Sequence, residues 1–77
     1  MQLLIDRSKN WVTINGTGHH VDCSNVPADL AMVRWFDDHG ELHYVDGRTT
    51  GLADIQRFKS IIDLWSDVHK ASQMATR

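Results

Sequence analysis

The residues best suited to chemistry are histidines and a cysteine, gathered mainly in the first half of the chain. The sequence holds five histidines and one cysteine; His19, His20 and Cys23 are near neighbours, and His39 and His43 follow. Imidazole and thiolate are good zinc ligands, with bonds of about 2.0–2.3 Å. On a strand, however, positions 19 and 23 would lie about 13 Å apart, and the remaining pairings offer at most two ligands each. We therefore expect no metal site and no cofactor.

The same part of the chain makes a weak case for nucleophilic or acid–base catalysis. Cys23 is close to histidines in the sequence, but catalytic Cys–His pairs are assembled by the fold rather than by adjacent positions. Asp37, Asp38 and Glu41 cluster in and beside an expected turn, where aspartate is favoured for backbone hydrogen bonding. No glycine-rich loop runs into a helix in the way that phosphate binding requires. The sequence therefore predicts no catalytic residue and no enzyme.

Short strands followed by one helix must carry these residues. Alternating or β-branched apolar runs predict strands near residues 3–6, 11–14, 19–23, 31–36 and 41–45. The pair Asn15-Gly16 favours a hairpin, and Thr17-Gly18 extends its loop toward four residues. From Asp54 the apolar period becomes 3.6, which predicts an amphipathic helix with a stripe formed by Ile55, Phe58, Ile62, Trp65 and Val68 or His69.

Together these elements predict an α+β fold. We expect a small two-layer domain with four to five mostly antiparallel strands, followed by one C-terminal helix packed on one face of the sheet. The single domain spans residues 1–77, with strands within about 2–46 and the helix within about 54–72. Residues 71–77 lack an apolar stripe, so we expect the C-terminus to fray.

Aromatic residues that find no place in the expected core point to a binding surface. Trp11 alternates with the core-facing residues of its strand and therefore falls on the opposite face of the sheet. We expect Phe36 and Tyr44 to lie outside the core in the same way, on the face of the sheet opposite the helix. Aromatic residues and arginine dominate interface energetics. The candidate protein-interface residues are therefore Trp11, Phe36, Tyr44 and Arg48; the alternative is that Trp11 only packs across neighbouring strands.

Length and composition narrow the classes of function. At 77 residues and 8.8 kDa the chain has room for one thin core, so association into a homodimer is one way to add stability. The 8 basic and 10 acidic residues give a net charge of −2, which argues against a nucleic-acid partner. No apolar run approaches the roughly 18 residues of a membrane span. A single cysteine excludes an intramolecular disulfide and favours synthesis in the cytoplasm.

Several short segments within residues 3–65 are distinctive when taken together: Ile5-Asp6-Arg7, Val12-Thr13-Ile14-Asn15-Gly16, Val21-Asp22-Cys23-Ser24, Pro27-Ala28-Asp29-Leu30, Val33-Arg34-Trp35, residues 40–48, Leu52-Ala53-Asp54-Ile55, and the pattern of Phe58, Ile62, Asp63 and Trp65. In these segments the chain resembles a group of small proteins encoded among the tail genes of bacteriophages and prophages, often described as tail or tail-fibre assembly proteins. Such relatives often carry a Ser-Pro start signal where this chain has Ile55-Gln56-Arg57, so the start of the helix stays open by two or three residues.

The resemblance implies a non-enzymatic tail accessory or assembly protein that binds another tail protein, such as the tail fibre, through its open sheet face or an edge strand. It carries over no catalytic residue. It implies a location in the cytoplasm of the bacterial host during assembly, or in the virion tail. The alternative function is a small phage-encoded regulator or inhibitor that binds a host protein. A metal-dependent enzyme or metal-binding module built on the histidines is a third hypothesis.

Overall fold

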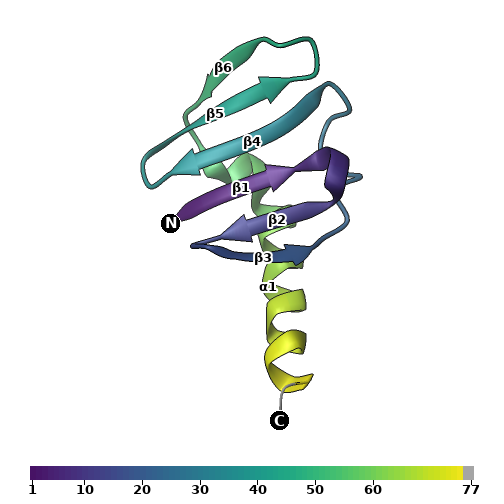
Figure 1. Ribbon diagram of the computed structural model, residues 1–77. Coiled ribbons are helices and arrows are strands. Elements are labelled where there is room, and N and C mark those ends of the chain that lie inside the picture. Colours follow the sequence, from purple (N-terminus) through teal and green to yellow (C-terminus); the bar gives the residue numbers. More distant parts are fainter. Residues whose placement is uncertain (76–77) are drawn as a thin grey trace.

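The computed structural model describes residues 1–75 and contains one six-stranded antiparallel sheet and one helix (Figure 1). The strands lie in the order β3-β2-β1-β4-β5-β6, so the first strand of the chain is one of the two central ones. Their bounds are β1 Gln2–Asp6, β2 Trp11–Ile14, β3 Thr17–His20, β4 Leu30–Phe36, β5 His39–Tyr44 and β6 Thr49–Leu52. A 3₁₀ turn, η1 (Arg7–Lys9), joins β1 to β2, and a second, η2 (Ile55–Phe58), leads into α1 (Lys59–Ala75).

Two asparagines in left-handed conformations make the tight connections around β2. Asn15 (φ 50°) and Gly16 (φ 87°) form a two-residue turn between β2 and β3, shorter than the four-residue loop expected from the sequence. Positive φ at both positions is the requirement of a type I′ hairpin turn. Asn15 also exchanges hydrogen bonds with Gln2: its backbone N–H donates to the Gln2 carbonyl, and its Oδ1 accepts from the Gln2 N–H, each at 2.9 Å. The turn therefore extends the pairing of β2 with β1.

Asn10 holds the long crossover, residues 21–29, that carries the chain from the edge strand β3 back to the centre of the sheet. Its backbone is left-handed (φ 49°), and its carbonyl accepts a hydrogen bond from the Val21 N–H at 2.9 Å. Its side-chain Oδ1 accepts from the Cys23 N–H at 3.0 Å. Farther along, Arg7 Nε donates to the Val26 carbonyl at 2.9 Å. These bonds fasten the crossover over the sheet and bury Val21, Cys23 and Val26.

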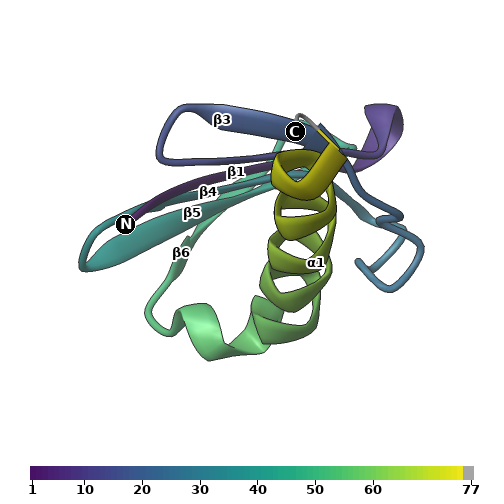
Figure 2. The same cartoon turned by 90° about the horizontal axis from the view of Figure 1, so that it is seen from below.

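The core lies between α1 and one face of the sheet. In the strand register, Leu3 is opposite both Ile14 and Trp35, and Ile5 is opposite both Val12 and Val33. Residues in register share a face of the sheet, so these side chains form one apolar layer. Phe58 and Ile61 cover it from η2 and α1. Figure 2 shows α1 on one side of the sheet only.

These elements confirm the predicted α+β class, with more strands than expected. The added strand is β6, which pairs with β5 and lies beyond residue 46, where the expected strands end. The predicted helix over about 54–72 covers η2 and most of α1, and Asp54 caps this region by accepting from the Gln56 N–H at 2.9 Å. The helix continues to Ala75, within the segment expected to fray; residues 76–77 lie outside the described part of the chain.

Replacing Asn10 tests whether it fastens the crossover. Asn10→Ala removes the oxygen that accepts the hydrogen bond from the Cys23 N–H. It also places alanine, whose side chain cannot form hydrogen bonds, in a left-handed conformation. The free energy of unfolding should therefore fall by about 2–3 kcal/mol. Asn10→Gly restores only the backbone freedom and should lose less. Urea unfolding measures both, with Asn25→Ala in the exposed crossover turn as the control. Equal losses for Asn10→Ala and Asn25→Ala would contradict this role.

Candidate functional site

The sheet face that carries no helix is the main candidate site. Side chains alternate along each strand, so the residues between the core positions point to this second face. We call it the open face; by strand register its side chains are those of Gln2, Leu4, Asp6, Trp11, Thr13, His20, Met32, Arg34, Phe36, His39, Glu41, His43 and Thr49. Leu4, Met32 and Phe36 are half-buried and Trp11 is 36% exposed, so the open face mixes apolar and polar groups.

Trp11 lies flat over the edge strand β3 at one end of the open face. Its ring meets that of His20, the residue opposite it in register, edge to face, with centroids 5.0 Å apart and planes at 87°. Its indole also covers Gly18: a Cβ built at that glycine would come within 2.5 Å of Trp11 Nε1. Gly18 is therefore required by the close approach of the indole. The absent side chain allows a large aromatic ring to lie along β3.

Phe36 marks the other end of the open face. The Arg34 guanidinium lies over its ring at 5.3 Å from the centroid, and the His39 ring is 5.5 Å away on the other strand of the hairpin. A shallow depression of about 210 Å³ adjoins Phe36 and is lined mainly by Leu4, Thr13 and Arg34. Among residues 1–75, Arg34 has no salt bridge, although Glu41 lies opposite it in register. The lining of the depression thus combines apolar side chains, such as Leu4 and Phe36, with Arg34, which forms no salt bridge with a described acidic residue.

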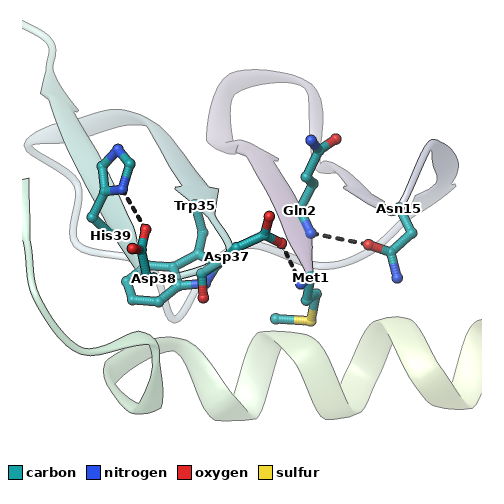
Figure 3. Close-up of polar contacts among 7 residues, drawn as sticks. All are labelled: Met1, Gln2, Asn15, Trp35, Asp37, Asp38 and His39. Atoms are coloured by element: carbon teal, nitrogen blue, oxygen red, sulfur yellow. Dashed lines mark hydrogen bonds and ion pairs between the residues drawn. The ribbon is translucent and has the colours of Figure 1, made fainter.

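Polar contacts at the N-terminus hold the β4–β5 turn, which directly follows Phe36 (Figure 3). The Met1 ammonium group pairs with Asp37 Oδ1 at 2.7 Å, and the Asp37 N–H donates to the Met1 carbonyl at 3.0 Å. Trp35 Nε1 donates to the Asp37 carbonyl at 3.2 Å. Beside it, the side-chain hydrogen bond from His39 to Asp38, at 2.7 Å, lowers the pKa of the Asp38 carboxyl from its ordinary value. These contacts fix the β4–β5 turn and, with it, the position of Phe36.

Tyr44 and Arg48 lie on the other side of the sheet. Tyr44 shares its face with Leu42, packs against the buried core, and accepts a hydrogen bond from Thr50 Oγ1 at 3.3 Å. Arg48 lies over the Tyr44 ring at 5.2 Å and pairs with Asp46 at 2.7 Å. Of the four residues predicted as an interface, the structure therefore brings Trp11 and Phe36 to one face and Tyr44 and Arg48 to another.

The residues predicted as possible metal ligands are dispersed. Within residues 1–75 no group of three or more histidine, cysteine or acidic side chains is placed to hold a metal ion. His20 and His43 point to the open face, where His43 Nε2 is enclosed and has no hydrogen-bond partner among residues 1–75. His19 points to the other face and meets His69 of α1. This last contact joins positions 50 residues apart, and no spacing pattern in the sequence could have indicated it.

Cys23 is enclosed in the core. Its side chain is 1% exposed, and its Sγ donates to the Val21 carbonyl at 3.3 Å. Burial raises the pKa of the Cys23 thiol above its ordinary value, with a smaller contribution from Asp22. A nucleophilic cysteine needs an accessible thiolate, and both burial and the raised pKa work against one here.

Comparison of the chain with protein-family models, curated proteins and solved structures gives no match. In the part of the chain that the structure describes, no helix has the length and hydropathy needed to cross a membrane.

The contact between Trp11 and Gly18 can be tested by a double-mutant cycle. Gly18→Ala places a methyl group where the indole lies, so the free energy of unfolding should fall by about 1–3 kcal/mol. With Trp11→Ala as background, the same substitution should cost much less, because the clash is gone. Gly51→Ala is the matched control, since Gly51 also lies in an edge strand and an added Cβ meets nothing within 4 Å. An unchanged cost in the Trp11→Ala background would contradict the contact.

Proposed function

We propose that this chain is a non-enzymatic binding protein that presents its open face to another protein. The observation that carries the proposal is the open face itself: α1 covers one side of the sheet, and Trp11 and Phe36 remain on the uncovered side, where a shallow depression borders Phe36. Aromatic side chains and arginine are the residues that most often dominate protein interfaces. The open face offers both, on a rigid sheet.

The arrangement suits a partner that covers both the depression beside Phe36 and the indole of Trp11. Trp11 and Phe36 lie on strands β2 and β4, which flank β1. The sheet fixes their separation, so little conformational freedom would be lost on binding. Full burial of an exposed large apolar side chain is worth about 1.5–3 kcal/mol through apolar area alone. Trp11 and Phe36 are already partly buried, so each would gain part of that amount. Arg34, already held over Phe36, adds a cation that a partner carboxylate can pair with.

Within this class, we propose a phage or prophage tail accessory or assembly protein that binds another tail protein, with the tail fibre as the first candidate. The support is the resemblance in the short segments between residues 3 and 65, many of which form the strands of the sheet. The proposed location is the bacterial host cytoplasm during assembly, or the virion tail. Tyr44 and Arg48 remain predicted interface residues for a second contact, because they lie together on the other side of the sheet.

Co-expression with the product of the neighbouring tail-fibre gene tests the proposal. We expect a stable complex, and we expect Trp11→Ala and Phe36→Ala each to weaken it at least tenfold, which corresponds to about 1.4 kcal/mol. Val45→Ala is the control, because Val45 is an exposed apolar residue in the turn after β5 and lies off the open face. Isothermal titration calorimetry of the purified partners measures the affinities.

Two results would contradict the proposal in different ways. If the chain forms no complex with fibre, tube or baseplate proteins, the assignment to tail assembly fails, and a complex with a host protein would favour the regulator hypothesis instead. If a tail protein binds but Trp11→Ala and Phe36→Ala leave its affinity unchanged, the open face is not the binding surface.

A further inference from the structure

The far half of α1 is fastened to the edge strand β3 by two histidines, which we call the histidine pair: His19 of β3 and His69 of α1. His19 Nε2 lies 2.9 Å from His69 Nδ1, which is a hydrogen-bond distance. Trp65 stacks on His69, with centroids 4.7 Å apart and planes at 12°, and its Nε1 donates to the Thr17 carbonyl at 3.2 Å. The His19–His69 contact and the Trp65–Thr17 hydrogen bond both join α1 to β3.

The geometry of the histidine pair is that of a shared proton rather than of a metal site. The ring centroids are 5.2 Å apart while the facing nitrogens are 2.9 Å apart. The difference between these two distances is about equal to the two ring radii together. The two centroids and the two facing nitrogens are therefore almost in line, so each nitrogen points almost straight at the other. An ion between them would have to push the rings apart, and the described residues supply no third ligand.

The hydrogen bond requires at least one ring of the pair to be unprotonated at the facing nitrogen. A neutral imidazole has one donor and one acceptor nitrogen, whereas a protonated imidazole has two donors and no acceptor. Gln73 Nε2 lies 3.1 Å from His69 Nε2, so an amide N–H can donate to that nitrogen. His69 then carries its proton on Nδ1 and donates to His19 Nε2. The chain of donors runs from Gln73 through His69 to His19.

We propose that the histidine pair is a pH-sensitive latch that docks the C-terminal half of α1 on β3 at neutral pH and releases it in mild acid. One added proton can still be shared between the rings. When both rings are protonated, two donors and two positive charges face each other, and the hydrogen bond is lost. The docked state therefore resists the second proton.

Among residues 1–75, no group with an opposite charge forms a salt bridge with the pair that would offset this repulsion. On β2, the residue opposite His19 is Val12, and on β3 the neighbouring His20 points to the open face. On α1, Asp67 and Lys70 are exposed, and within residues 1–75 neither forms a salt bridge with the pair. In the crossover that follows β3, Asp22 is exposed and accepts from the Ser24 N–H.

Release should be confined to the C-terminal half of the helix. Phe58 and Ile61, at the start of the helical region, are buried against the sheet and contain no titratable group. Beyond Ile62, the residues toward the sheet are the half-buried Trp65 and His69, and Figure 1 shows α1 continuing past β3. Loss of the latch would therefore loosen the helix from Trp65 onward, leaving Trp65 with its bond to the Thr17 carbonyl, while the core contacts of Phe58 and Ile61 stay closed.

The sign of the pH dependence follows from proton binding. The released state takes up more protons than the docked state, so docking is favoured as the pH rises. The effect should appear on going from neutral to mildly acidic solution. If one proton separates the two states, the ratio of docked to released protein changes by up to tenfold per pH unit.

Amide hydrogen exchange of the full chain tests the latch. Protection of residues 65–75, corrected for intrinsic exchange rates, should fall by about tenfold or more between about pH 7.5 and about pH 5. His69→Gln keeps a neutral hydrogen-bonding side chain and should make this protection independent of pH. His20→Asn is the matched control, since it removes the neighbouring histidine on the opposite face and should behave like the unmodified protein.

Three results would overturn the latch. Protection of residues 65–75 that is equal at both pH values in the unmodified protein would do so, as would an undiminished pH dependence in His69→Gln. Loss of protection in the central strands β1 and β4 together with α1 would mean that the whole domain unfolds. If His69→Gln does not fold, His19→Gln takes its place, with the same pH-independent protection expected and the same contrary result decisive.

Discussion

Residues 1–75 form six strands and one α-helix, so the helix covers only one face of the sheet. This constraint determines where the large side chains lie. The apolar residues of one sheet face meet Phe58 and Ile61, and the crossover closes the same core with Val21, Cys23 and Val26. Within residues 1–75 there is no second α-helix for the other face. The open face is therefore covered by its own side chains, such as Trp11, which lies over Gly18, and Arg34, which lies over Phe36.

The class of fold could be predicted from the sequence because alternation of period two and period 3.6 is a local property of the chain. Trp11 and Phe36 were placed correctly on the uncovered face by counting alternate residues from the core positions. Tyr44 was not, although it follows Leu42 by two residues and so shares its face. The strand β6 was missed because Thr49–Leu52 is polar and exposed except for its last residue, which leaves no alternating apolar signal.

Contacts between distant positions were beyond prediction from one sequence. The pairing of His19 with His69 depends on the angle at which α1 crosses the sheet, and that angle is set by packing at the other end of the helix. The apolar stripe of the expected helix includes His69 as one option, so the spacing indicates that His69 can face the sheet. It does not indicate that His69 meets His19. Likewise, the left-handed backbone of Asn10 follows from the path of the crossover, to which its side chain is bonded, rather than from its neighbours in sequence.

The close fit of Trp11 over Gly18 constrains the order in which the sequence can change during evolution. Any residue with a side chain at position 18 meets the indole at once, so that position stays glycine for as long as the tryptophan is present. The tryptophan, by contrast, can be replaced first. Homologues that have lost the aromatic ring should therefore be free to vary at position 18, and those that keep it should not. The two positions would then covary in an alignment, and the covariation would identify the relatives that keep an aromatic open face.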